Sequence, residues 1–219
     1  MEAKHLIARR VAQELKDGDV VNLGIGLPTL IPCYLPADVR ITLQSENGFL
    51  GLGPLEGAPL PDLVNAGGMP CGMKPGTAFF DSAMSFSIIR GGHVDVTVLG
   101  GLQVDQHGNL ANWMVPGKMV PGMGGAMDLV TGARNVIVAM EHTTRDGGPR
   151  ILRQCTLPLT AAGKVRVVVT ELAVFRFIDG RLTLTETAPG VTPVQVLATT
   201  EAEFVVSPDC HPMQLTDGT

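Results

Sequence analysis

The feature that most constrains the fold is a strand–turn–helix–strand pattern early in the chain. Val20–Leu23 reads as a short buried strand, and Gly24-Ile25-Gly26 follows it as a turn. Pro28 suits the first turn of a helix through about Tyr34, and Ile41–Gln44 reads as the next strand. Two strands joined by a crossover helix favour a right-handed parallel unit.

The rest of the chain predicts further elements of the same two kinds. Ile7, Val11 and Leu15 stand four residues apart, which indicates an amphipathic helix over residues 3–17. Shorter helices are expected near 82–89, 129 and 192–199. The remaining strands are expected at 94–99, 136–140, 166–170, 173–178, 182–185 and 204–206.

Three other segments are read from glycine, proline and polar residues. Residues 50–77 indicate a long ordered loop, and Gly108-Asn109 indicates a hairpin turn. The tail after Ser207 is expected to be irregular. We therefore predict one α/β domain over residues 1–219, with a mixed, largely parallel sheet flanked by helices.

Charge and cysteine usage exclude several classes of protein. The formal net charge is −5 and the basic residues are scattered, which argues against nucleic-acid binding. The four cysteines lie far apart, so neither a disulfide framework nor a zinc site is expected. Residues 1–19 mix acids and bases, unlike a signal peptide, and prolines interrupt the uncharged stretch Val20–Ala37, unlike a membrane span. We expect a cytoplasmic protein that binds neither nucleic acid nor membrane.

Common catalytic and cofactor motifs are absent or incomplete. The sequence has no Gly-x-Ser-x-Gly and no His-Glu-x-x-His, and its five histidines lack metal-site spacing, so no metal is expected. Gly24 and Gly26 begin a dinucleotide fingerprint, but Thr29 stands at its third glycine position. Gly117-Lys118 is followed by Met119, which breaks a phosphate-binding loop motif.

Three polar or glycine-rich clusters remain as candidates for chemistry. Ser45-Glu46-Asn47-Gly48 and Asn22–Gly26 each follow a predicted strand, and ligands bind beyond the carboxyl ends of strands in open α/β sheets. The third cluster, Gly122–Asp128, runs into a predicted helix. Its backbone N–H groups would suit a phosphate or an oxyanion.

These clusters alone leave three classes of function open. One is an enzyme that reacts at Glu46. A second is a sugar-phosphate isomerase or related phosphate-binding domain, in which Gly122–Asp128 and the nearby Lys118 would hold the phosphate. The third is a non-catalytic ligand-binding domain in which Glu46 is only structural.

Four motifs in order resemble the β subunits of family I coenzyme A transferases, and the resemblance covers about residues 3–205. It is strongest to enzymes acting on acetate and acetoacetate, and relatives acting on succinyl or 3-oxoadipate substrates share the motifs. The four segments are Val21–Thr29, Leu43–Pro54, Arg90-Gly91-Gly92-His93 and Gly122–Val130.

The resemblance implies a role for each candidate residue. Glu46 corresponds to the family's nucleophile, which carries coenzyme A as a glutamyl thioester. The residues expected to stabilise oxyanions or bind coenzyme A are Asn22, Gly24, Gly26, Asn47, Gly48, Gly122, Gly124, Gly125, Ala126 and Asp128. The resemblance also implies a partner, the α subunit of an α2β2 heterotetramer. Its implied substrates are acyl-CoA and short-chain carboxylates, with no permanently bound cofactor.

Overall fold

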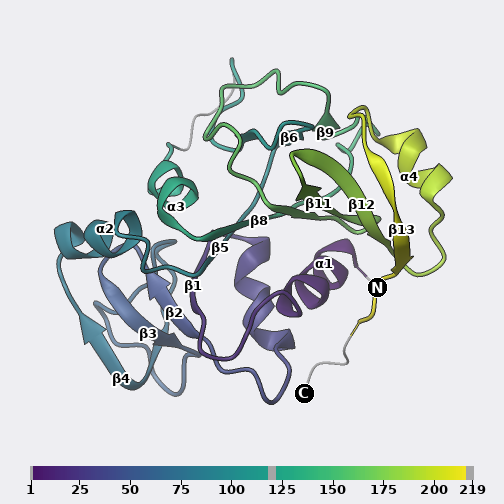
Figure 1. Ribbon diagram of the computed structural model, residues 1–219. Helices are drawn as coiled ribbons and strands as arrows, with labels where there is room; N and C mark the ends of the chain where they lie inside the picture. Colours follow the sequence, from purple (N-terminus) through teal and green to yellow (C-terminus); the bar gives the residue numbers. More distant parts are fainter. Residues whose placement is uncertain (1, 118–121, 216–219) are drawn as a thin grey trace.

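The computed structural model describes residues 2–117 and 122–215, which fold into helices packed around a large sheet (Figure 1). The helical elements are α1 (Ala3–Ala12), the 3-10 helix η1 (Leu27–Tyr34), α2 (Ser82–Arg90), α3 (Ala126–Gly132) and α4 (Pro193–Thr199). The strands are β1 (Val20–Leu23), β2 (Thr42–Ser45), β3 (Phe49–Gly53), β4 (Gly72–Phe79), β5 (Val96–Leu99), β6 (Gln103–Asp105), β7 (Leu110–Ala111), β8 (Asn135–Ala139), β9 (Ile151–Leu152), β10 (Val167–Val169), β11 (Ala173–Ile178), β12 (Arg181–Thr187) and β13 (Val205–Pro212).

Ten of these strands form one sheet in the order β13-β12-β11-β10-β8-β5-β1-β2-β3-β4. The central strands β10, β8, β5, β1 and β2 are parallel, and antiparallel pairs extend the sheet towards both edges. A separate small sheet has the order β7-β6-β9. The predicted α/β fold with a mixed, largely parallel sheet is therefore confirmed.

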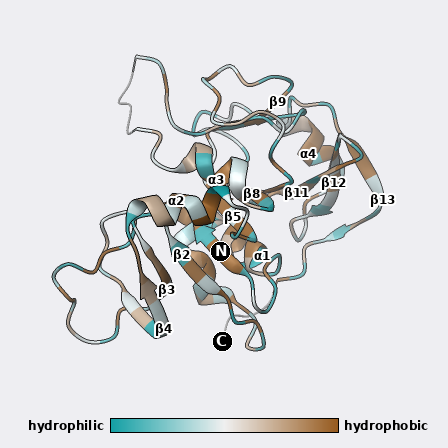
Figure 2. Ribbon diagram, turned by 60° about the vertical axis from the view of Figure 1, so that its left-hand side comes forward, coloured by the Kyte–Doolittle hydropathy of each residue, from teal (hydrophilic) through white to brown (hydrophobic). Residues whose placement is uncertain are grey.

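Each face of the sheet packs against its own apolar cluster. On one face, Ile7 and Val11 of α1 pack with β-strand residues such as Val21. On the other, α2 and α3 contribute buried side chains, including Ile89 and Leu129. The scarcity of aromatic residues fits this core, which is built mainly from aliphatic side chains. Figure 2 shows α2 and α3 side by side, near β2 and β3.

Two of the predicted helices differ in detail from the observed ones. The opening helix ends at Ala12 rather than near residue 17, and the chain turns at Gly18, whose φ is +87°. Residues 27–34 form a 3-10 rather than an α-helix, with Pro32 inside it. Proline lacks the N–H that an α-helix needs and disfavours the α conformation of the residue before it.

Two predictions of irregular structure hold only in part, since residues 54–71 and 213–215 lie outside any helix or strand but their neighbours do not. The segment 50–77 contains most of β3 and β4, which form antiparallel pairs at the edge of the sheet. Gly51, with a φ of +96°, marks an irregularity in that pairing rather than a loop. The tail after Ser207 also continues β13 as far as Pro212, because β12 offers it a parallel partner.

The hairpin predicted at Gly108-Asn109 is confirmed by the antiparallel pair β6–β7. Across the two described ranges, no helix is long and apolar enough to cross a membrane.

Candidate active site

The carboxyl ends of β1 and β2 lie side by side, as the sequence predicts. The strands are parallel neighbours, with Asn22 in register with Gln44. The run Ser45–Gly48 leaves β2 directly beside the turn Gly24–Gly26 that leaves β1. Two of the three candidate clusters therefore lie together at the carboxyl ends of the parallel strands.

The third cluster meets them at Glu46. The Gly125 N–H donates a hydrogen bond to Glu46 Oε1 at 3.3 Å, across 79 residues of sequence. Glu46 is half-buried and Gly125 is buried. A Cβ atom on Gly125 would lie only 2.5 Å from Glu46 Oε2, and one on Gly124 would lie 3.6 Å from Oε1. Glycine thus lets the backbone approach the carboxylate closely.

The turn that carries Glu46 is fixed by its neighbours. Gly48 has a φ of +125°, and a Cβ atom there would lie 2.2 Å from the Phe80 carbonyl oxygen. The Phe80 N–H donates to the Gly48 carbonyl at 2.9 Å, and Asn47 Nδ2 donates to the Val64 carbonyl at 2.8 Å. Asn47 is exposed, whereas Gly48 is buried.

Asn22 lies beneath this turn and does not face solvent. Its side chain is buried, and Nδ2 donates to Gln44 Oε1 at 2.6 Å. Gln44 in turn donates to Ser85 Oγ of α2 at 3.0 Å. In this conformation the Asn22 amide supports β2, and its predicted contact with an oxyanion or coenzyme A stays a prediction.

Gly24 and Gly26 shape the turn after β1. The Gly24 N–H donates to the Val98 carbonyl at 2.8 Å, and a Cβ atom on Gly24 would lie 3.2 Å from that oxygen. Gly26 has a φ of +86° and precedes η1, where its carbonyl accepts from the Thr29 N–H at 3.0 Å. Glycine at position 24 allows the close approach to the Val98 carbonyl, and glycine at position 26 allows the left-handed φ.

The remaining predicted residues belong to the loop and first turn of α3. Gly122 is exposed with a φ of +91°, and Ala126 is the first residue of α3. Asp128 Oδ1 accepts from Arg90 Nε at 2.7 Å, which joins α3 to α2. The Asp128 carboxylate is therefore engaged with α2. Lys118, weighed as a phosphate ligand, lies outside the described residues.

No role was predicted for Gln44, Ser85 or Arg90, whose side chains join β1, β2, α2 and α3 behind the site. The signals were a polar Gln44 inside a predicted buried strand and the presence of Gln44 and Arg90 in two of the four motifs. Within residues 2–117 and 122–215, no group of three or more His, Cys, Asp or Glu side chains could hold a metal ion.

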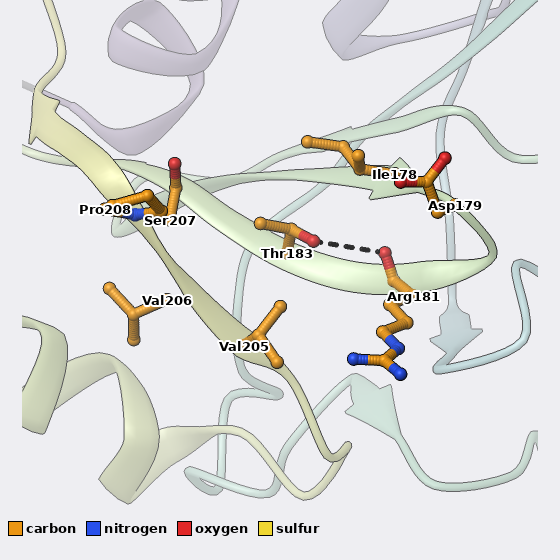
Figure 3. Close-up of a pocket in the computed structure, with 8 residues that line it drawn as sticks. All are labelled: Ile178, Asp179, Arg181, Thr183, Val205, Val206, Ser207 and Pro208. Atoms are coloured by element: carbon orange, nitrogen blue, oxygen red, sulfur yellow. Dashed lines mark hydrogen bonds between the residues drawn. The ribbon is translucent and has the colours of Figure 1, made fainter.

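A separate hollow of about 550 Å³ lies between β12 and β13, at the opposite end of the sheet (Figure 3). Its lining includes Arg181, Val205 and Val206, and Thr183 Oγ1 donates to the Arg181 carbonyl at 3.2 Å. The sheet order separates this hollow from Glu46, so it does not belong to the site described above.

Comparison with known proteins decides the family. A family model described as coenzyme A transferase matches residues 4–199. The chain belongs to this family. The run Ser45–Gly48 and the loop that includes Gly125 meet at the Glu46 side chain in this structure.

Relatives within the family match nearly the whole chain. It is 69% identical over 211 residues to the beta subunit of the acetate CoA-transferase of Escherichia coli K12, covering 96% of this chain and 97% of the relative. It is 65% identical over 216 residues to the Haemophilus influenzae protein of the same name, covering 98% and 97%.

A solved structure adds a comparison of length. The acyl-CoA transferase of E. coli O157:H7 superimposes with a TM-score of 0.78 at 26% identity. The match covers 97% of this chain but 43% of that one, so this chain spans less than half of that transferase. Family membership sets aside the isomerase and the non-catalytic interpretations of the three clusters.

Proposed function

We propose that this chain is the β subunit of a short-chain acyl-CoA:carboxylate CoA-transferase, with Glu46 as its covalent nucleophile. The observation that carries the proposal is the Glu46 carboxylate held against the Gly125 N–H. A carboxylate needs no partner base to be ionised at neutral pH. Covalent catalysis of this kind predicts ping-pong kinetics.

The first half-reaction moves coenzyme A onto the enzyme. A Glu46 carboxylate oxygen attacks the acyl-CoA carbonyl, the carbon–sulfur bond breaks, and the thiolate leaves with its electron pair. The product is a mixed anhydride between Glu46 and the acyl group. The thiolate then attacks the glutamyl carbonyl, which releases the first carboxylic acid as its carboxylate and leaves a glutamyl–CoA thioester.

The second half-reaction reverses these steps with the acceptor. The acceptor carboxylate attacks the glutamyl thioester and expels the thiolate, which forms a second anhydride. The thiolate then attacks the acceptor's acyl carbonyl. New acyl-CoA leaves and the Glu46 carboxylate is regenerated, so no net proton transfer is required.

Each addition places negative charge on a carbonyl oxygen. Backbone N–H groups can stabilise that charge, and losing one such donor typically costs ~10²–10³ in rate. Gly125 presents its N–H next to the reacting carboxylate. We assign it this role, with Gly122, Gly124 and Ala126 shaping the loop that presents it and Asn47 and Gly48 shaping the opposite turn.

A second polypeptide completes the enzyme in this proposal. The relatives at 69% and 65% identity are named as beta subunits. A mouse mitochondrial succinyl-CoA:3-ketoacid transferase is 48% identical, and this chain covers only 41% of it. We infer that an α subunit supplies the remaining part of the coenzyme A cleft in an α2β2 heterotetramer, and we expect the isolated chain to be inactive.

Short acids without a second charge are the proposed acyl groups. Between residues 54 and 71 the ionisable side chains are the acidic Glu56 and Asp62, apart from the thiol of Cys71. The nearby Lys74 donates Nζ to the Ile41 carbonyl at 3.4 Å. This segment therefore offers little positive charge to bind the second carboxylate of a dicarboxylic acid. Succinyl or 3-oxoadipate substrates are the alternative, since a Bacillus subtilis relative at 52% identity is named as one subunit of a probable succinyl-CoA:3-ketoacid coenzyme A transferase.

A kinetic panel tests this proposal. The chain, its co-purified partner and their complex are each supplied with acetoacetyl-CoA and with acetate, butyrate, succinate or 3-oxoadipate. We expect only the complex to transfer coenzyme A, with acetate and butyrate preferred and with parallel-line ping-pong kinetics. Undiminished transfer by a Glu46→Gln complex would refute the nucleophile, whereas preference for succinate would refute only the substrate class.

A further inference from the structure

A row of buried polar side chains lies directly behind the nucleophile. Asn22 of β1 and Gln44 of β2 are neighbours across the parallel pair, and Ser85 projects from α2. Their exposed fractions are 4%, 3% and 0%. Buried polar groups are costly unless hydrogen-bonded, so these three need a common explanation.

The three side chains satisfy one another in sequence. Asn22 Nδ2 donates to Gln44 Oε1 at 2.6 Å, and Gln44 Nε2 donates to Ser85 Oγ at 3.0 Å. The Ser85 hydroxyl then donates to the Ser45 carbonyl, with an oxygen–oxygen distance of 3.5 Å. Ser85 thus holds the side chain of Gln44 by a normal hydrogen bond and makes a long, weak one to the main chain of the residue just before Glu46.

The network continues beyond the nucleophile. Ser45 Oγ donates to Asn47 Oδ1 at 2.6 Å and accepts from the Ala66 N–H at 3.1 Å. Asn47 Nδ2 donates to the Val64 carbonyl at 2.8 Å. Hydrogen bonds therefore fix the residues on both sides of Glu46, one set from the core and one from the loop 64–66.

Helix α2 also supports the opposite wall of the site. Arg90, at its C-terminal end, donates to Asp128 of α3 at 2.7 Å. A Cβ atom on Gly132 of α3 would lie 2.1 Å from the Ile89 carbonyl oxygen, so the two helices touch backbone to backbone. The helix that holds the end of β2 is therefore the one that holds α3, which follows Gly125.

We propose that Ser85 is a positioning residue for Glu46, and this inference rests on the proposed function. Its hydroxyl sets where the end of β2 stands relative to α2, and hence where the Glu46 carboxylate stands relative to the Gly125 N–H. Ser85 touches neither substrate nor Glu46. A displacement of about 1 Å at a reacting group can cost ~10² in rate.

The test is Ser85→Ala in the assembled enzyme. We expect kcat, and the single-turnover rate of CoA adduct formation on Glu46, to fall about 10-fold or more while KM for acyl-CoA stays within about twofold. The matched control is Ser87→Ala on the same helix, where the exposed hydroxyl donates back to the Ala83 carbonyl at 2.8 Å. That control should retain wild-type kcat.

A purely structural role would give a different result. Ser85→Ala would then lower the urea midpoint but leave kcat per folded complex unchanged, which would overturn the inference. If Ser85→Ala does not assemble, Ser85→Cys carries the same test with a side chain of similar size and weaker hydrogen bonding. Absence of an adduct on Glu46 in the wild-type enzyme would instead refute the proposed function. The failure of the Ser85 inference and the failure of the proposed function are therefore distinguishable.

Discussion

Replacing Gly125 by alanine tests the contact on which the site depends. The new Cβ would lie 2.5 Å from Glu46 Oε2 and 2.9 Å from Glu46 Cδ. Favourable contact between heavy atoms begins near ~3.5 Å, so the carboxylate must move by about 1 Å. The backbone itself accepts alanine, because Gly125 has a φ of −82° and a ψ of 5°.

The expected outcome separates catalysis from folding. The end of a flexible side chain can yield, so Gly125→Ala should fold with unchanged stability or a gain of up to about 1 kcal/mol from reduced unfolded-state entropy. A shift of about 1 Å in the nucleophile should slow adduct formation about 100-fold.

The assay is a stopped single turnover of the assembled enzyme with acyl-CoA, quenched and measured by mass spectrometry. Gly100→Ala is the matched control, since a Cβ atom there meets no heavy atom within 4 Å. Wild-type adduct formation by Gly125→Ala would refute the placement of Glu46 against this loop.

Two further predictions concern stability. Gly48→Ala forces a side chain onto a φ of +125° and places Cβ 2.2 Å from the Phe80 carbonyl oxygen, so the free energy of unfolding should fall by at least about 2 kcal/mol in urea titration. His142 is held between Thr170 and Thr200 at 2.9 Å each, and burial lowers its pKa to about 4 from 6.5. Because the unfolded state then binds more protons, up to about 3 kcal/mol of stability is lost as pH falls from about 6.5 to about 4. Urea titrations at pH 7 and pH 5 should show about 2 kcal/mol of this loss in the wild type and a smaller loss in His142→Gln; equal losses would refute it.

Local sequence patterns predict much of the parallel core because they depend on neighbouring residues. The unit from Val20 to Gln44 follows from β-branched runs separated by Gly and Pro, and its strands pair as expected. The same patterns predicted a loop from residue 50 onward, because the glycines in residues 50–53 obscured a strand that pairing with β2 and β4 stabilises. The continuation of β13 to Pro212 likewise depends on pairing with β12, a separate strand that the local sequence of residues 208–212 does not reveal.

The candidate site likewise has one part that the sequence predicts and another that it does not. Ser45–Gly48 and Asn22–Gly26 could be placed together from strand order alone. The approach of Gly125 to Glu46 depends on a contact across 79 residues, which spacing does not encode. Asp128 pairs with Arg90, because α2 and α3 pack against each other, and its expected contact with coenzyme A or an oxyanion stays a prediction. The Ser85 contact is equally non-local, so the supporting residues were not predicted.

The proposed mechanism requires a covalent bond to Glu46, which mass spectrometry of the assembled enzyme can detect. The complex is mixed with acetoacetyl-CoA in the absence of an acceptor acid, digested, and mapped by peptide mass. We expect a coenzyme A adduct on the peptide that contains Glu46, removed by hydroxylamine and absent from Glu46→Gln. Full turnover with no adduct on this peptide, or an adduct on another side chain, would contradict it.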